Sequence, residues 1–337
     1  MRLMVTGGAG FIGSNFVRYW IKKHPADKVV VYDALTYAGT LTSLADLEGS
    51  YRFVHGDIAD SEAVGSALRE HKTEVVVNFA AESHNSLAII DPGRFFRTNV
   101  MGTQGLLEAC RHSDIERFHH VSTCEVYGDL DLDSPHSFTE SSPYLPRTPY
   151  NASKAGADHA VRAYYLTYDV PISITNCSNN YGRYQFPEKV IPLFVTNALD
   201  DKPLPLYAST QNRREWIHAL DHSSAIEAVI RRGSVGETYH VGTGIEKSIE
   251  EIADLVIEAL SKPASLKTIV PDRPSHDRRY LLDSSKIRAE LGWEPEVGFE
   301  DGLRDVIEWY ALNRSWWEPL KANAPVVEGQ AWAKNSS

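Results

Sequence analysis

The chain has 337 residues, which is enough to bury a sizeable core and to form one large domain or two modest ones. Its formal charge of −11 at pH 7 argues against a nucleic-acid-binding surface, which would need a basic patch. No apolar run reaches the roughly 20 residues of a membrane helix, so we expect neither a membrane anchor nor a targeting leader.

The first predicted elements form a strand–turn–helix unit. Residues 2–6 are a short apolar run, Gly7, Gly10 and Gly13 follow, and residues 14–23 have a helical pattern. Glycines at this spacing permit a tight turn and let a pyrophosphate approach the backbone at the helix N-terminus. The unit is typical of a dinucleotide-binding site.

The second predicted strand, residues 29–32, ends at Asp33. A carboxylate here is expected to bind the ribose hydroxyls of adenosine and to repel a 2′-phosphate, which favours NAD over NADP. Strand and helix patterns then alternate, with strands at 75–79, 118–122 and 172–176 and helices at 61–71, 100–111 and 150–168. This order predicts an α/β fold with a Rossmann-type doubly wound parallel sheet.

Prolines interrupt shorter pieces after residue 181, and helical patterns return at 248–260 and 299–312. We expect a NAD-binding domain at 1–180 and a smaller, discontinuous C-terminal substrate-binding region at 181–317, whose elements can return to the first domain. The last residues, 318–337, are expected to form a poorly ordered tail.

The chain has three cysteines, Cys110, Cys124 and Cys177, which are far apart in sequence. No cysteine or histidine spacing indicates a zinc site, so we expect no metal. Free thiols are typical of the reducing cytoplasm, which is the expected location. Cys110 lies in an apolar helical stretch and is expected in the core.

Reactive side chains gather after the fourth predicted strand and in the helix near residue 150. Thr123, Cys124 and Glu125 follow the strand, whereas Tyr150 and Lys154 lie one helical turn apart and share a helix face. A lysine ammonium lowers the pKa of a nearby phenol. Such a tyrosine can take a proton from an alcohol while a nicotinamide takes the hydride.

The chain resembles the extended short-chain dehydrogenase/reductase family, and within it the dTDP-glucose 4,6-dehydratases, along nearly its whole length. Besides the motifs above, the resemblance rests on Leu-Thr-Tyr-Ala-Gly (35–39), Ala-Ala-Glu-Ser-His (80–84), Thr-Asn-Cys-Ser-Asn-Asn-Tyr-Gly (175–182), Phe-Pro-Glu-Lys (186–189) and Asp-Arg-Pro-Ser-His-Asp-Arg-Arg-Tyr (272–280).

This resemblance implies the ligands and the residues that contact them. NAD is implied to bind Gly7, Gly10, Phe11, Ile12, Gly13, Asp33, Thr36, Asp57, Ile58, Ala80, Ala81, Tyr150 and Lys154. A nucleotide-diphosphate sugar is implied to bind Ser83, His84, Asn179, Lys189, Arg214, Arg273 and His276. A homodimer is also implied, through the helices at 100–111 and 150–168.

The implied reaction of such a lyase has three parts. Tyr150 takes the C4 hydroxyl proton of the hexose while NAD takes the C4 hydride, and Thr123 hydrogen-bonds that oxygen. Glu125 then removes the C5 proton. Finally the C6 hydroxyl leaves as water with help from an acid at position 124.

Position 124 departs from the family. The active-site sequence of the family is Ser-Thr-Asp-Glu-Val-Tyr-Gly, and in this chain Cys124 replaces the aspartate. A thiol, with a pKa of ~8.5, is protonated at neutral pH but is the weaker donor, so it permits elimination while slowing it or changing its outcome. The tunicamycin-pathway 5,6-dehydratase type also has cysteine there. Two alternatives therefore stay open, namely a 5,6-ene product and a C4 or C6 epimerase that uses the same 4-keto intermediate.

Other departures lie near the expected substrate. Asn85-Ser86-Leu87-Ala88 replaces the family's Val-Asp-Arg-Ser, and residues 207–210 and 239–243 differ in segments that flank the nucleotide. These changes leave the sugar and the nucleobase open. They also admit a third alternative, a non-catalytic nucleotide-binding sensor.

Overall fold

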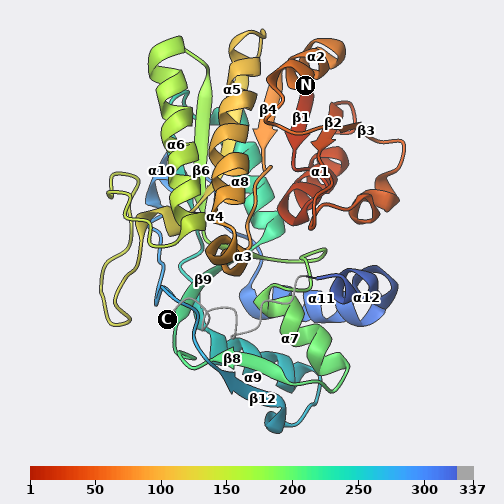
Figure 1. Cartoon of the computed structure of the whole chain (residues 1–337), viewed down its shortest axis with the longest axis vertical. Coiled ribbons are helices and arrows are strands. Elements are labelled where there is room, and N and C mark those ends of the chain that lie inside the picture. The colour runs from red at the N-terminus through yellow and green to blue at the C-terminus, as the bar shows by residue number, and fades with distance from the viewer. Residues whose placement is uncertain (325–337) are drawn as a thin grey trace.

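A computed structural model describes residues 1–324, with parallel strands as its central layer (Figure 1). The strand order is β10 (Thr238–Val241), β6 (Ile172–Cys177), β5 (Arg117–Thr123), β4 (Val75–Asn78), β1 (Arg2–Thr6), β2 (Lys28–Asp33) and β3 (Arg52–His55). Because β1 pairs with both β2 and β4, the glycine turn that follows β1 leaves from inside the sheet. The predicted Rossmann-type doubly wound sheet is confirmed.

Alternate side chains of β1 pack on opposite faces of this sheet, as the strand period of two requires. Leu3 and Val5 share a buried apolar cluster with residues of α1 (Phe11–Lys23) and α8 (Ala219–Arg232). Met4 belongs to the cluster on the other face. That face is covered by α2 (Ser61–His71), α5 (Thr103–Arg111) and α6 (Pro149–Tyr168).

A smaller region below the sheet in Figure 1 has its own core. Its elements are β7 (Asn179–Tyr181), α7 (Val190–Leu199), β8 (Leu204–Tyr207), β9 (Arg213–His218), β11 (Glu246–Ser248), α9 (Ile249–Ala259), β12 (Lys267–Val270), α11 (Phe299–Leu312) and α12 (Arg314–Ala322). The connecting elements are η1 (Leu41–Leu47), α3 (Asn85–Ile90), α4 (Pro92–Phe95), η2 (Phe96–Gly102), η3 (Cys124–Tyr127), η4 (Ala264–Leu266) and α10 (Ser285–Leu291).

Some sequence-based expectations need correction. The helix predicted at 100–111 is divided, because the π-helical segment η2 continues to Gly102 before α5 begins. The predicted tail begins too early, because α12 extends to Ala322 and anchors itself through the buried Trp317. Residues 325–337 of that tail lie outside the described residues. The short strand β3 was not predicted. A return of C-terminal elements to the first domain was expected, but the strand that does so, β10, was not identified.

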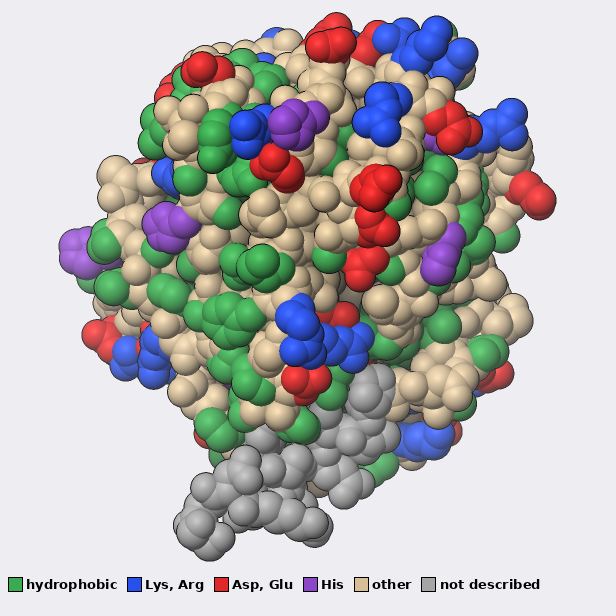
Figure 2. All heavy atoms as spheres, turned by 45° about the horizontal axis from the view of Figure 1, so that its top comes forward, with side chains coloured by type: hydrophobic (Ala, Val, Ile, Leu, Met, Phe, Trp, Pro, Cys, Tyr) green, Lys and Arg blue, Asp and Glu red, His purple; other side chains and the backbone are tan. Residues whose placement is uncertain are grey.

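Two further observations bear on the surface. Within residues 1–324, no helix is both long and apolar enough to cross a membrane. Figure 2 shows one face on which acidic and basic side chains are interspersed, without a continuous basic patch.

Candidate active site

A large cavity, about 1030 Å³ in volume, lies at the carboxyl ends of the parallel strands. Its lining comes from the loops after β1, β2, β4, β5 and β6 and from the smaller region. In open α/β sheets ligands bind at this edge.

The glycine turn packs so closely against neighbouring backbone that larger residues would not fit at Gly7 and Gly13. Gly7 has φ +67°, and a Cβ placed on it would lie 2.5 Å from the backbone nitrogen of Ala80. A Cβ on Gly13 would lie 2.3 Å from the carbonyl oxygen of Gly7. Backbone is therefore exposed to the cavity at the N-terminus of α1, where Gly10 is the N-cap. This geometry fits a dinucleotide pyrophosphate.

Asp33, at the end of β2, is buried and fixed by backbone groups. Its carboxylate accepts hydrogen bonds from the amides of Ala9 (2.9 Å) and Leu35 (2.8 Å). Burial raises the pKa of Asp33, and these two hydrogen bonds oppose the shift. A carboxylate held at this edge suits ribose hydroxyls.

The structure brings together nearly all of the side chains that the sequence selected. The cofactor-side residues line the cavity: Gly7, Gly10, Phe11, Ile12, Gly13, Asp33, Thr36, Asp57, Ile58, Ala80 and Ala81. The substrate-side residues line it too: Ser83, His84, Asn179, Lys189, Arg214, Arg273 and His276. Thr123, Glu125, Tyr150 and Lys154 complete the lining. Among the selected residues, Cys124 alone does not contribute to it.

Tyr150 and Lys154 project from the first turns of α6. This helix starts where the Thr148 side chain accepts a hydrogen bond from the Asn151 amide (3.2 Å), with Pro149 in the first turn. The Lys154 ammonium donates to the Val121 carbonyl at 2.8 Å. That bond fixes the lysine against strand β5.

The expected lowering of the Tyr150 pKa by Lys154 is wrong for this structure. Burial raises the pKa of Tyr150 well above its ordinary value, and the negative charge of Glu125 adds to the shift. Burial also lowers the pKa of Lys154. Burial is thus the largest cause of both shifts.

Thr123 and Glu125 lie at the point where β5 passes into the short helix η3. The Thr123 hydroxyl oxygen accepts a hydrogen bond from the Glu125 amide at 3.2 Å, which caps η3. Burial raises the pKa of Glu125, opposed by the charges of Arg273 and Arg214 and by a hydrogen bond from Asn85. The Glu125 side chain is therefore a buried carboxylate with a raised proton affinity.

Cys124 has a different environment from its two neighbours. It is 1% exposed and belongs to an apolar cluster that includes Tyr127, Tyr280 and Leu282. Burial raises the pKa of its thiol well above the ordinary value, and the Glu125 charge raises it further. Cys110 is buried in the core, as expected.

Basic side chains gather at the substrate end of the cavity. Lys189, Arg214 and Arg273 line it together. Burial lowers the pKa of His84 to about 3, and Lys189 and Arg273 contribute to this shift. Burial likewise lowers the pKa of His276 to about 3, assisted by Arg273 and Arg214. The positive potential suits a diphosphate.

Sequence reasoning did not select several lining residues. Cys177 lines the cavity, and its thiol donates to the Ser122 carbonyl at 3.3 Å. Tyr37 lines it as well, and its hydroxyl donates to Glu188 at 3.1 Å. Asn85 was noted as a departure, but its contact with Glu125 was not foreseen. Among residues 1–324, no group of three or more His, Cys, Asp or Glu could hold a metal ion.

A Rossmann-type sheet whose cavity joins a glycine turn, a strand-end aspartate and a Tyr-x-x-x-Lys pair defines an extended short-chain dehydrogenase/reductase. Within that class, the GDP-mannose 4,6 dehydratase family profile matches residues 4–306. The chain belongs to this family.

Similar proteins include the dTDP-glucose 4,6-dehydratase of Mycobacterium tuberculosis strain H37Rv. It is 48% identical over 322 residues, which cover 95% of this chain and 96% of the relative. The crystal structure of DesIV, a dTDP-glucose 4,6-dehydratase from Streptomyces venezuelae solved with NAD bound, has a TM-score of 0.91 and 49% identity, and covers 95% of this chain and 100% of its own. The structure of the UDP-glucose 4-epimerase of Thermus thermophilus has a TM-score of 0.85 and 30% identity, and the match covers 92% of this chain and 99% of the epimerase chain.

Proposed function

We propose that the protein is an NAD-dependent nucleotide-sugar 4,6-dehydratase, a hydro-lyase that oxidises C4 of a hexose transiently and expels the C6 hydroxyl as water. One observation carries this proposal: Glu125 lines the same cavity as Tyr150, Lys154 and the glycine turn. A Tyr–Lys pair serves alcohol oxidation, whereas an additional carboxylate serves removal of a proton beside the new ketone. The relatives named dTDP-glucose 4,6-dehydratase match over almost their full length and support it.

In the oxidation, Tyr150 takes the proton of the C4 hydroxyl. NAD, when bound, supplies the acceptor for the C4 hydride and the source of its return to C6. The Thr123 hydroxyl oxygen already accepts the Glu125 amide, so its own hydrogen is free to donate to the C4 oxygen. Lys154 lies one helical turn from Tyr150 on the same face of α6, where a positive charge opposes the rise that burial causes in the Tyr150 pKa.

In the elimination, Glu125 removes the C5 proton that the C4 ketone has made acidic. The C5–H electron pair forms the C5–C6 double bond as the C6–O bond breaks. Because the Cys124 thiol does not line the cavity, we assign delivery of a proton to the departing C6 oxygen to Glu125, which has just received one. The carboxylate is thereby regenerated, and one water leaves. Return of the hydride to C6 would be completed by a solvent proton at C5, which balances the proton that Tyr150 took from the C4 hydroxyl and releases to solvent.

A nucleoside diphosphate hexose fits the basic end of the cavity. Arg214, Lys189 and Arg273 provide the charges for a diphosphate. We take dTDP-glucose as the first substrate to test, because the similar dehydratases are named for it. The altered segment at 207–210 borders this end, since Tyr207 lines the cavity.

We also propose a homodimer, built on η2–α5 and α6. Large apolar side chains on these helices are exposed: Phe96 (42%), Met101 (58%), Leu166 (79%) and Tyr168 (45%). Exposed apolar area on neighbouring helices favours a protein–protein interface. A mass of one chain by light scattering at micromolar concentration would overturn this assignment.

Two further expectations remain proposals. A cytoplasmic location is supported by Cys110, Cys124 and Cys177, all of which are free thiols. The division at residue 180 into a cofactor domain and a substrate region is supported by their separate apolar cores, with α8 and β10 returning to the first domain.

The proposed function is tested by incubating the protein with nucleotide sugars and NAD and measuring the masses of the products by mass spectrometry. We expect the nucleotide sugar to lose the mass of one water. A product of unchanged mass would favour an epimerase instead, and no turnover of any nucleotide sugar would favour a binding protein.

A further inference from the structure

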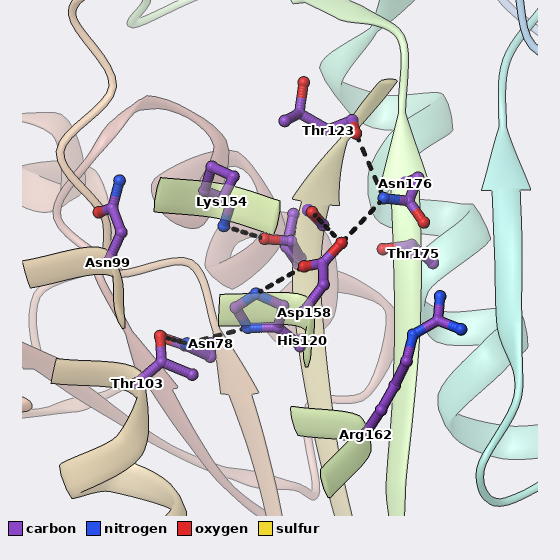
Figure 3. A network of polar contacts seen from close by, with 12 residues as sticks. Asn78, Asn99, Thr103, His120, Thr123, Lys154, Asp158, Arg162, Thr175 and Asn176 are labelled. Carbon is purple, nitrogen blue, oxygen red and sulfur yellow. Dashed lines mark hydrogen bonds and ion pairs between the residues drawn. The ribbon is translucent and has the colours of Figure 1, made fainter. Parts of the chain in front are cut away.

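A buried carboxylate lies behind the Tyr–Lys pair, one helical turn beyond Lys154. Asp158 is 0% exposed, and neither it nor the neighbouring His120 lines the cavity. Figure 3 shows Asp158 between α6 and the strands β5 and β6, close to Lys154 and His120. It therefore cannot touch a substrate and can act only through other side chains.

Hydrogen-bond donors from separate segments converge on one oxygen of Asp158. Its Oδ2 accepts from the hydroxyls of Ser122 (2.8 Å) and Tyr144 (2.8 Å) and from the amide of Asn176 (3.2 Å). The same Asn176 amide also reaches the Thr123 carbonyl at 3.2 Å. The carboxylate thus fixes the ends of β5 and β6 beside Thr123.

The other oxygen of Asp158 faces a neutral histidine. Oδ1 lies 3.4 Å from Nε2 of His120, and Nδ1 of His120 lies 3.1 Å from the amide nitrogen of Asn78. Since the Asn78 amide can only donate, Nδ1 accepts and Nε2 holds the proton that faces Asp158. The Asn78 oxygen in turn accepts from Thr6, the residue before the glycine turn, at 2.6 Å.

Lys154 and Asp158 carry opposite charges on successive turns of α6. Burial alone would raise the pKa of Asp158, but the contact with His120 and the charge of Lys154 hold it below its ordinary value. Burial lowers the pKa of Lys154, and the charge of Asp158 opposes that shift. Burial and Lys154 keep the pKa of His120 low, so His120 stays neutral.

We propose that Asp158 is a positioning residue for the reaction, whose buried negative charge retains Lys154 as an ammonium while its hydrogen bonds hold the strand ends that place Thr123. This inference rests on the proposed function only for the choice of substrate. The interaction between the charges of Asp158 and Lys154 does not depend on which substrate binds.

Other ionisable groups also lie near Lys154 and Asp158. Cys177 of β6 lies near Lys154, and Tyr127 of η3 lies near Asp158. Arg162, one turn beyond Asp158, donates instead to Tyr144 (3.2 Å) and to the Thr238 hydroxyl (3.1 Å). Within the described residues, no ion pair within 4.0 Å joins Asp158 to Arg162 or to Lys154, whose ammonium contacts the Val121 carbonyl. The charge of Lys154, four residues earlier on the same face of α6, nevertheless acts on the buried carboxylate.

The test is the pH dependence of C4 oxidation in Asp158→Asn, followed as enzyme-bound NADH in a single turnover. Loss of the negative charge lowers the pKa of Lys154, so the loss of rate at alkaline pH should move down by about one unit. At a pH on that limb the variant should be about tenfold slower than the wild type when each rate is divided by the optimum of the same protein. A lower rate with an unshifted profile would overturn the proposal.

Asp221→Asn is the matched control. Asp221 is also a buried helical carboxylate (3% exposed). Away from the cavity, it accepts hydrogen bonds from the backbone amides of Glu296 (2.9 Å) and Val297 (3.0 Å). We expect this variant to lose stability without a shift of the pH profile. An equal shift in both variants would overturn a specific role for Asp158.

A thermodynamic cycle of unfolding temperatures measures the same charge interaction without an activity assay. Removing one partner of a buried charge pair leaves the other uncompensated, whereas removing both does not. The double variant Asp158→Asn with Lys154→Met should therefore have a higher Tm than Asp158→Asn alone. Additive losses in Tm would show that the two charges do not interact, and would overturn the proposal independently of any activity.

Discussion

The side-chain amide of Asn85 donates a hydrogen bond to the Glu125 carboxylate, with 3.2 Å between Nδ2 and Oε2. The Asn85 oxygen accepts in turn from the hydroxyl of Thr148, the N-cap of α6, at 3.4 Å. The proposed C5 base is thereby connected to the start of the helix that holds Tyr150. Valine, the family's residue at position 85, could make neither bond.

Asn85→Val should shift the pH dependence of C5 deprotonation. The Asn85 hydrogen bond lowers the pKa of Glu125 against the dominant effect of burial, so its removal raises that pKa. Because the base must be ionised, activity should then be lost at a higher pH on the acid side. Solvent deuterium incorporation at C5 against pH measures this shift.

Ser86→Ala is the control for that variant, because Ser86 lines the cavity next to Asn85. We expect its acid limb to coincide with that of the wild type. A profile of Asn85→Val that coincides as well would remove Asn85 from any role at Glu125.

Tyr150→Phe should abolish turnover while NAD and the nucleotide sugar still bind. The lost hydroxyl acts on the reacting C4 oxygen, whereas binding depends on the glycine turn and the basic end of the cavity. General acid–base groups contribute about 10²–10⁴-fold to rate. More than about a tenth of the wild-type rate, with binding checked by calorimetry, would contradict the role.

Cys124→Ala tests whether the thiol or the carboxylate serves the C6 oxygen. Since Cys124 packs in an apolar cluster, we expect a Tm lower by about 2–4 °C, as for roughly 1 kcal/mol. The rates of C4 oxidation and of water loss should stay within a few-fold of the wild type. Selective loss of the elimination step by more than about a hundredfold would instead identify Cys124 as the acid.

Gly13→Ala should weaken NAD binding at least tenfold. The new Cβ would lie 2.3 Å from the Gly7 carbonyl oxygen, so the turn must move away from the geometry that admits a pyrophosphate. Gly298→Ala is the control, because its Cβ would meet only Asp301 Oδ2, at 3.7 Å. Equal NAD affinity of both variants would contradict the assignment.

The sequence predicted the local elements well where their periodicity was strong. Helices α2 and α11 begin and end at the predicted residues, 61–71 and 299–312. The four-residue strand β10 was missed because its membership depends on pairing with the distant β6. Short apolar runs do not by themselves reveal such a partner.

The candidate site could be assembled from motifs, but its energetics could not. Spacing placed Tyr150 and Lys154 on one helix face, yet burial determines the direction of the Tyr150 pKa. Adjacency suggested that Cys124 would share the cavity with Thr123 and Glu125. In the tight turn of η3 successive side chains diverge, and the thiol enters an apolar cluster.

We propose that the protein converts a nucleotide hexose to its 4-keto-6-deoxy form. The most direct measurement is a proton NMR spectrum of the product formed from dTDP-glucose in deuterated buffer. We expect a C6 methyl signal together with deuterium at C5. Exocyclic vinyl protons, or altered ring couplings without a methyl signal, would contradict the claim and identify a 5,6-ene or an epimer instead.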